Sequence, residues 1–226
     1  MTIKERYQKI IDYFSDHQPE ANTELHYNSA YELLVAVILS AQCTDKRVNM
    51  ITPDFFEMFP APSILATASK NEVFELIKSC SYPNNKTRNL LGMAKVLTEK
   101  FGGKVPDNVE DLQQLPGVGR KTANVVASVI YKLPAMAVDT HVFRVAGRIG
   151  LTRLAKTPLE TEKQLVKYIP PEKIHLAHHW LILHGRYICQ ARKPKCLKCG
   201  INEYCRFFVS GKADKYLDNK KNAKKK

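Results

Sequence analysis

Four cysteines near the end of this 226-residue chain constrain its fold more than any other feature of the sequence. They are Cys189, Cys196, Cys199 and Cys205. The pattern C-x6-C-x2-C-x5-C gathers four thiols into one short segment, which in an intracellular chain favours a metal centre over two disulfides. A four-cysteine zinc site and an iron–sulfur cluster both fit, because only one short C-x2-C knuckle occurs and the spacers beside it are unequal.

Basic residues occupy the loop between the first two of these cysteines. The loop contains Arg192, Lys193 and Lys195, and a bound metal would hold it in one conformation. A loop that is already ordered binds phosphates at a lower entropic cost. We therefore expect the metal to shape a DNA-binding loop rather than to carry out redox chemistry.

The net charge of +13 is concentrated in the same part of the chain. From Arg186 to Lys226 there are 13 of the 35 Lys and Arg residues but only three of the 22 acids, which leaves 22 basic and 19 acidic residues elsewhere. A positive field confined to one segment indicates a polyanionic partner, nucleic acid before membrane. The last residues, Asn219–Lys226, fit a solvated, disordered tail, because such lysine runs are usually disordered.

The composition, 44% hydrophobic and 25% charged, is that of a folded globular protein. No apolar stretch approaches the ~18 to 20 residues that are needed to span a bilayer. Residues 1–20 are charged throughout and lack the apolar centre of a secretion signal. We expect an intracellular, cytoplasmic protein that has no membrane contact.

Helical periodicity covers almost the whole chain and predicts an all-α bundle of short helices. Ser29 followed by Glu32 predicts a capping box. It opens a helix whose expected apolar face is Leu33, Leu34, Val37, Ile38 and Ala41. Further helices are expected near the N-terminus and at about 46–59, 70–79, 85–101, 108–114, 120–132, 140–150, 158–168 and 174–188. Proline and glycine separate these segments, and no alternating run is long enough for a strand.

The segment L-P-G-V-G-R-K-T at Leu115–Thr122 lies between two of these helices. Gly117 and Gly119 permit a tight turn, after which the next helix begins with its amide N–H groups exposed. Such a turn binds phosphate through main-chain donors and the helix dipole, without reading sequence. The pattern matches the helix-hairpin-helix element of non-specific DNA binders, and an ordinary corner between two helices is the alternative.

Two candidate catalytic residues follow this turn. Lys121 falls in the first turn of the next helix, where the positive end of the helix dipole disfavours its charge. A lysine must lose a proton before it attacks carbon, so the position suits a nucleophile as well as a phosphate contact. Asp139 precedes the helix expected at 140–150, which makes it an N-cap or a carboxylate that stabilises charge on a sugar and moves protons.

Together these segments resemble the endonuclease III family of DNA glycosylases, and the resemblance covers almost the whole chain. It rests on the cysteine spacing and on four motifs. These are L-S-A-Q-x-T-D at Leu39–Asp45, L-P-G-V-G-R-K-T-A at Leu115–Ala123, V-D-T-H-V-F-R at Val138–Arg144 and H-H-W-L-I-L-H-G-R-Y-x-C at His178–Cys189. Each motif is fairly specific, and the ordered set is very specific.

The resemblance implies two helical lobes with a DNA-binding cleft between them. Residues 23–134 would form a six-helix barrel that contains the hairpin. Residues 1–22 and 135–212 would form the second lobe, with a 4Fe-4S cluster rather than zinc on the four cysteines. Residues 213–226 would be a basic, disordered tail, and the protein would act as a monomer.

The resemblance also implies a reaction. A damaged pyrimidine in double-stranded DNA would be flipped out of the helix, Lys121 would displace the base from the sugar C1′, and the Schiff base would permit β-elimination 3′ to the lesion. The same lyase step would act on an abasic site, and Asp139 would support attack and proton movement. The other expected DNA contacts are Gln42, Tyr82, Gly117, Gly119, Arg120, His141, Arg144, Arg192 and Lys193.

One loop departs from the family pattern. Relatives have a G-[LFV]-[YW]-N-x-K-A-like segment whose apolar residue is inserted into DNA. This chain has S-Y-P-N-N-K-T at Ser81–Thr87 instead. We expect Tyr82 to take the place of the apolar wedge, and lesion preference is the property that this change puts in doubt.

Three other functions compete with this interpretation. A mismatch-specific adenine glycosylase has a catalytic glutamate where this chain has Ala36, usually lacks a lysine at the position of Lys121, and carries an additional domain. A mismatch-specific thymine glycosylase is more distant. A non-catalytic binder of DNA structure would need only the hairpin and the basic loop, so the presence of both Lys121 and Asp139 argues against it.

Overall fold

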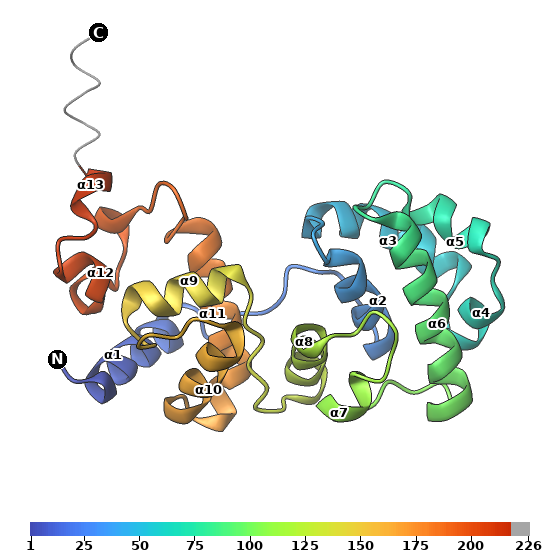
Figure 1. Ribbon diagram of the computed structural model, residues 1–226, viewed down its shortest axis with the longest axis horizontal. Coiled ribbons are helices and arrows are strands. Elements are labelled where there is room, and N and C mark those ends of the chain that lie inside the picture. The colour runs from blue at the N-terminus through green and yellow to red at the C-terminus, as the bar shows by residue number, and fades with distance from the viewer. Residues whose placement is uncertain (218–226) are drawn as a thin grey trace, which may run out of the picture. The chain divides into compact units, whose positions relative to one another are not determined.

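The computed structural model describes residues 1–217, and within that range the regular secondary structure is entirely helical. The all-α prediction is therefore confirmed. The chain divides into two compact units, one formed by Thr23–Lys132 and the other by Met1–Asn22 together with Leu133–Lys226 (Figure 1). No helix in the described residues is both long and apolar enough to cross a membrane.

The unit Thr23–Lys132 is built around α2 (Ala30–Ser40). Every residue from Leu33 to Leu39 is buried, because α3, α6 and α8 pack around this helix. The surrounding helices are α3 (Asp45–Met58), α4 (Pro62–Thr67), α5 (Lys70–Ile77), α6 (Pro83–Phe101), α7 (Val109–Leu112) and α8 (Arg120–Tyr131). A helix that is buried on every side must be apolar on every side, and the sequence of α2 meets this condition.

An aromatic core joins the N-terminal helix of the other unit to the C-terminal half of the chain. Here α1 (Ile3–His17) packs against α11 (Ile174–Tyr187), and Phe14 stacks on Trp180 with ring centroids 5.7 Å apart. The Trp180 indole N–H donates to the Gln18 carbonyl oxygen at 2.7 Å. The remaining elements are α9 (Thr140–Ile149), α10 (Pro158–Tyr168), α12 (Arg206–Val209), α13 (Asp214–Leu217) and the 3₁₀ turns η1 (Pro171–Lys173), η2 (Cys196–Lys198) and η3 (Asn202–Tyr204).

The start of α2 corrects one detail of the sequence analysis. The Ser29 hydroxyl accepts a hydrogen bond from the Glu32 amide at 3.1 Å, as expected of an N-cap, but the capping box is wrong. The Glu32 carboxylate accepts instead from the Asn28 amide at 2.7 Å. Ala41 lies beyond the helix and is exposed, so it does not belong to the apolar face.

The two compact units have boundaries near those expected for the two lobes. We expected a barrel at 23–134, and the unit with the hairpin is Thr23–Lys132. The segment expected to be a disordered tail, 213–226, begins with the short helix α13. Residues 218–226, which include the whole lysine-rich end Asn219–Lys226, lie outside the described part of the chain.

Candidate functional site

The turn between α7 and α8 takes its shape from Gly117. Its φ of +83° lies in the left-handed region that favours glycine. A Cβ at this position would lie 2.8 Å from the Cβ of Asn89, which is closer than packed carbons approach. Leu115 and Val118 are buried, and the Val118 amide donates to the Leu115 carbonyl oxygen at 3.0 Å. The fold itself therefore requires glycine at position 117.

Gly119 differs from Gly117, because the fold does not require it. It is the exposed N-cap residue of α8, and its φ of −84° suits any residue. A Cβ at this position would meet no atom of the described chain within 4 Å. No side-chain hydrogen bond caps this end of α8 within the described residues. The backbone at Gly119 therefore adjoins open space just before the first turn of α8, the end of a helix at which amide groups can bind a phosphate.

Lys121 lies in the first turn of α8 and is exposed, as is Arg120. Every residue from Ala123 to Val129 is buried, including the polar Asn124 and Ser128. Because packing on all sides holds the helix in place, its first turn presents Lys121 at a defined position on the surface of this unit.

Gln42 and Tyr82 are exposed and have left-handed backbone conformations, with φ values of +54° and +56°. Residues other than glycine seldom adopt this conformation, and it persists where the surrounding structure enforces it, often at functional sites. The Ser81 hydroxyl donates to the Gln42 carbonyl oxygen at 2.8 Å. This hydrogen bond joins residues 39 apart in the sequence, and it places side by side the two loops that carry Gln42 and Tyr82.

Asp139, in the other unit, is the half-buried N-cap residue of α9. Its Oδ1 atom accepts a hydrogen bond from the Val142 amide at 2.7 Å, so the expected N-cap is present. This bond fixes the orientation of the carboxylate. A carboxylate has two acceptor oxygens, and the cap uses only one of them.

His141 and Arg144 connect α9 to the end of α11. The Arg144 guanidinium donates to the carbonyl oxygens of Gly185 at 2.9 Å and Cys189 at 3.2 Å. It also lies 3.2 Å from Nδ1 of His141. These contacts give both residues a structural role, and their contact with DNA stays a prediction.

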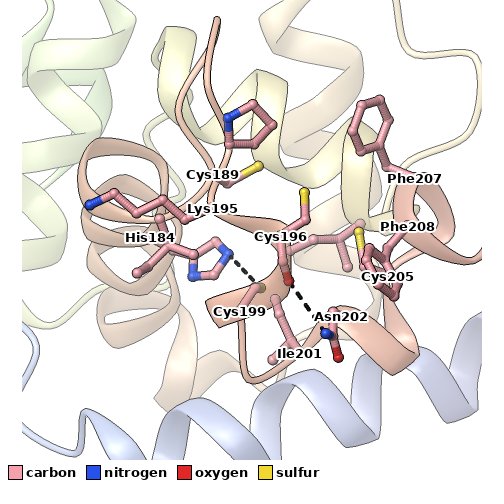
Figure 2. A pocket seen from close by; sticks show the side chains of 13 residues that line it. His184, Cys189, Lys195, Cys196, Cys199, Ile201, Asn202, Cys205, Phe207 and Phe208 are labelled. Carbon is pink, nitrogen blue, oxygen red and sulfur yellow. Dashed lines mark hydrogen bonds between the residues drawn. The ribbon is translucent and has the colours of Figure 1, made fainter. Parts of the chain in front are cut away.

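The four C-terminal cysteines line one pocket (Figure 2). Burial raises the pKa of Cys199 to about 11, and it also raises the pKa of Cys196 and of Cys205. Buried thiols ionise readily when a cation compensates for the loss of water, as it does when thiolates bind a metal. The donor set of this pocket therefore fits a positively charged, thiolate-binding metal group.

Two residues that the sequence analysis missed contact the cysteines of this pocket. The Arg148 guanidinium donates to Sγ of Cys189 at 3.6 Å and to the Gln190 carbonyl oxygen at 2.8 Å. Nε2 of His184 lies 3.6 Å from Sγ of Cys199 (Figure 2). Burial lowers the pKa of His184 to about 4, so its ring is neutral at physiological pH. His184 lies within the motif before Cys189, whereas no pattern in the sequence pointed to Arg148.

Within residues 1–217, the structure shows no group of three His, Cys, Asp or Glu side chains already arranged around one metal ion. Arg192 and Lys193 are exposed in the loop that links the first two cysteines, as the DNA-binding hypothesis requires.

Residues 35–171 match the family described as HhH-GPD superfamily base excision DNA repair protein, and this match places the chain in that superfamily. The endonuclease III of Rickettsia prowazekii (strain Madrid E) is 45% identical over 202 residues, which cover 89% of this chain and 95% of the relative. The endonuclease III of Escherichia coli K12 is 40% identical over 88% of this chain and 94% of its own length. The chain belongs to the endonuclease III family of DNA glycosylases and abasic-site lyases.

Solved structures agree with this assignment. A trapped covalent intermediate of an endonuclease III with DNA has a TM-score of 0.87 and 41% identity, covering 93% of this chain and 99% of the other. A thermostable thymine-DNA glycosylase has a TM-score of 0.83 but only 24% identity, over 91% of this chain and 98% of the other. At this level of identity, the similarity to the thymine-DNA glycosylase shows a shared fold and nothing more.

Proposed function

We propose that this chain excises oxidised pyrimidines from double-stranded DNA and then cuts the abasic site on its 3′ side, with Lys121 as the covalent nucleophile. The placement of Lys121 carries this proposal, because a buried helix holds the residue at the surface beside an open helix N-terminus. Fixed placement of a nucleophile beside bound phosphates removes much of the entropic barrier to attack. Borohydride trapping on a duplex with one thymine glycol tests the proposal, and we expect a covalent adduct at Lys121.

The proposed reaction begins after the damaged nucleotide has been flipped out of the helix. The unprotonated amine of Lys121 bonds to the sugar C1′ while the bond from C1′ to the base breaks, and the base leaves with that electron pair and takes up a proton. The sugar ring opens to give a Schiff base. Loss of a C2′ proton then expels the 3′ phosphate by β-elimination, and water releases the lysine.

Asp139 would assist the departure of the base. Positive charge develops on the sugar as the bond to the base breaks, and an oriented carboxylate stabilises that charge. The cap hydrogen bond to Val142 holds the carboxylate in one orientation and uses only one of its oxygens. The second oxygen would be available for the proton movement that the family resemblance implies for Asp139.

The hairpin would bind one phosphate group through the amides at the start of α8. Replacing Gly119 by alanine is expected to weaken binding to undamaged and damaged duplexes alike, by roughly tenfold, because a methyl group enters the space for the phosphate and weakens charge-assisted hydrogen bonds. The free energy of unfolding should barely change, since a Cβ there meets no atom of the described chain. Fluorescence anisotropy at low salt measures the affinity.

Gly147→Ala is the matched control for this change, because Gly147 is also exposed and a Cβ there meets no atom within 4 Å. It should leave DNA affinity unchanged. Equal affinities of the Gly119→Ala variant and the unaltered protein would remove the hairpin from the DNA interface.

Gln42 and Tyr82 would enter the gap that the flipped nucleotide leaves. Tyr82→Ala is expected to weaken binding to a lesion duplex by roughly tenfold, because stacking of a base on an aromatic ring contributes about 1–3 kcal/mol. Binding to an intact duplex should change much less, since no gap is open there. Tyr82→Phe keeps the ring and should keep the affinity. Loss of affinity for both duplexes equally, or for neither, would refute the wedge role.

A 4Fe-4S cluster on Cys189, Cys196, Cys199 and Cys205 would complete the second unit. The shared pocket and its buried thiols support a thiolate-bound metal group, and the family resemblance favours the 4Fe-4S cluster over zinc. The cluster would tie together the segment from Cys189 to Cys205 and add no step to base excision. Held in this way, Arg192 and Lys193 would contact phosphates. On the basis of the family resemblance, we also propose that the protein acts as a monomer, in the cytoplasm, on DNA.

A further inference from the structure

Cys43 and Cys80 lie outside the C-terminal cluster and have no part in the proposed reaction. Their Sγ atoms are 3.8 Å apart, although 37 residues separate them in the sequence. Cys43 directly follows Gln42, and Cys80 lies two residues before Tyr82. The two thiols thus face each other where the Ser81–Gln42 hydrogen bond holds these two loops together.

The local backbone permits these sulfurs to approach further. A disulfide has an S–S distance of about 2.05 Å, so the two Sγ atoms must approach each other by ~2 Å. Both residues lie in irregular segments, Cys43 between α2 and α3 and Cys80 between α5 and α6. Rotation of the side chains and small shifts of these loops can supply the movement without disrupting a helix.

We propose that Cys43 and Cys80 are a redox modification site. They exchange with soluble disulfides to form a reversible disulfide with each other, and this bond lowers the affinity for damaged DNA. The effect on DNA rests on the proposed function, in which Gln42 and Tyr82 enter the lesion gap. The formation of the disulfide does not depend on that function.

The two thiols have different exposures and so take different roles. Cys43 is partly exposed and directly precedes Thr44, the N-cap residue of α3. Cys80 is only 3% exposed, and burial raises its pKa to about 11, while the charges of Lys86 and Arg47 act in the opposite direction. Cys43 is therefore the thiol that meets an external oxidant, and Cys80 is the thiol that resolves the product.

The reaction is thiol–disulfide exchange in two steps. The thiolate of Cys43 attacks one sulfur of oxidised glutathione, which forms a mixed disulfide and releases one glutathione thiolate. Cys80 loses its proton and attacks the Cys43 sulfur of that mixed disulfide, which forms the Cys43–Cys80 bond and releases the second glutathione. Two protein thiols are oxidised and one glutathione disulfide is reduced to two thiols.

The new bond would act on DNA binding through the neighbouring residues. The loop shifts that help to close the gap between the sulfurs would displace Gln42 and Tyr82, which already have constrained left-handed backbones. Side chains that enter a base stack must be placed closely, and a shift of about 1 Å can cost up to a hundredfold in a positioned site. We expect lesion affinity to fall by at least about tenfold and to recover on reduction.

The experiment treats the full-length protein, as purified with its metal centre, with oxidised glutathione at neutral pH. The protein is then unfolded, thiols that react with iodoacetamide are counted, and tryptic peptides are mapped by mass spectrometry. Affinity for a thymine glycol duplex is measured before treatment, after it, and after dithiothreitol. Iron content is followed throughout, so that damage to the cluster is recognised.

Cys43→Ser and Cys80→Ala are the matched controls, because each keeps the four C-terminal cysteines and removes one partner. Cys43→Ser should not respond to oxidised glutathione with loss of affinity, whereas Cys80→Ala should stop at the mixed disulfide on Cys43, which mass spectrometry recognises by the added glutathione. A linked peptide pair containing Cys43 and Cys80, with reversible loss of affinity in the unaltered protein and no loss in Cys43→Ser, is the expected result.

The proposal is overturned if Cys43 and Cys80 stay alkylatable, or if the linked protein binds the lesion duplex as well as the reduced protein does. An equal loss in the unaltered protein and in both variants would also overturn it, because that loss would originate in the cluster. Failure of the reduced protein to act on damaged DNA would instead refute the proposed function, while the linked peptides would still report the disulfide.

Discussion

Lys121→Gln is expected to abolish the covalent adduct and to lower both base release and strand cleavage by at least about 10³-fold, since removing a covalent nucleophile elsewhere costs up to about 10⁶-fold. Lys121 lies in the exposed first turn of an otherwise buried helix, so glutamine changes the chemistry and little of the packing. Binding to a duplex with an uncleavable lesion should fall only slightly, by the contribution of one positive charge. Single-turnover assays on a thymine glycol duplex measure the rates.

Lys132→Gln supplies the control for this change. Lys132 is exposed and caps the C-terminal end of the same helix, so the variant removes an equal charge far from the first turn of α8. Its rates should match those of the unaltered protein. If Lys121→Gln still forms an adduct or excises the base at a comparable rate, Lys121 is a phosphate contact and another group performs the chemistry.

Asp139→Asn is expected to lower the rate of base release by about 10² to 10⁴-fold, the range for loss of a positioned acid–base group. The structural role of Asp139 makes asparagine the informative replacement. Asn is as good an N-cap as Asp, so the hydrogen bond from the Val142 amide and the start of α9 should persist. Only the charge and the basic oxygen are lost.

Asp139→Ala separates the two roles of this residue. It removes the cap as well as the charge, and it should reduce the free energy of unfolding by about 1 kcal/mol more than Asp139→Asn does. Chemical denaturation measures this difference. An asparagine variant with full activity would show that Asp139 is an N-cap alone, whatever the stability of the alanine variant.

The helices were predictable because proline and glycine mark most of their ends and apolar residues recur at helical spacing. Pro62 shows the limit of this reasoning, since it starts α4, a helix that the sequence analysis did not expect. Proline has no amide hydrogen to donate and suits the first turn of a helix, so it begins helices as well as ending them. The capping boxes at Thr2–Glu5 and Ser69–Glu72 were also overlooked.

The candidate site was predictable where its residues form local motifs. The hairpin, Lys121, Asp139 and the four cysteines each lie in a short stretch whose chemistry can be read directly. Arg148 was not predictable, because its contact with the Cys189 sulfur spans 41 residues of sequence. The proximity of Cys43 and Cys80 depends in the same way on how α2, α3, α5 and α6 pack, and no local pattern records it.

The central claim is that Lys121 forms a Schiff base with the sugar of a damaged nucleotide. Its most direct test is borohydride reduction during reaction with a duplex that carries one thymine glycol, followed by peptide mapping of the trapped protein. The account predicts a covalent complex whose modified residue is Lys121, with a strand cut 3′ to the lesion in the unreduced reaction. Base release without a trapped complex, or a complex through another residue, would contradict it.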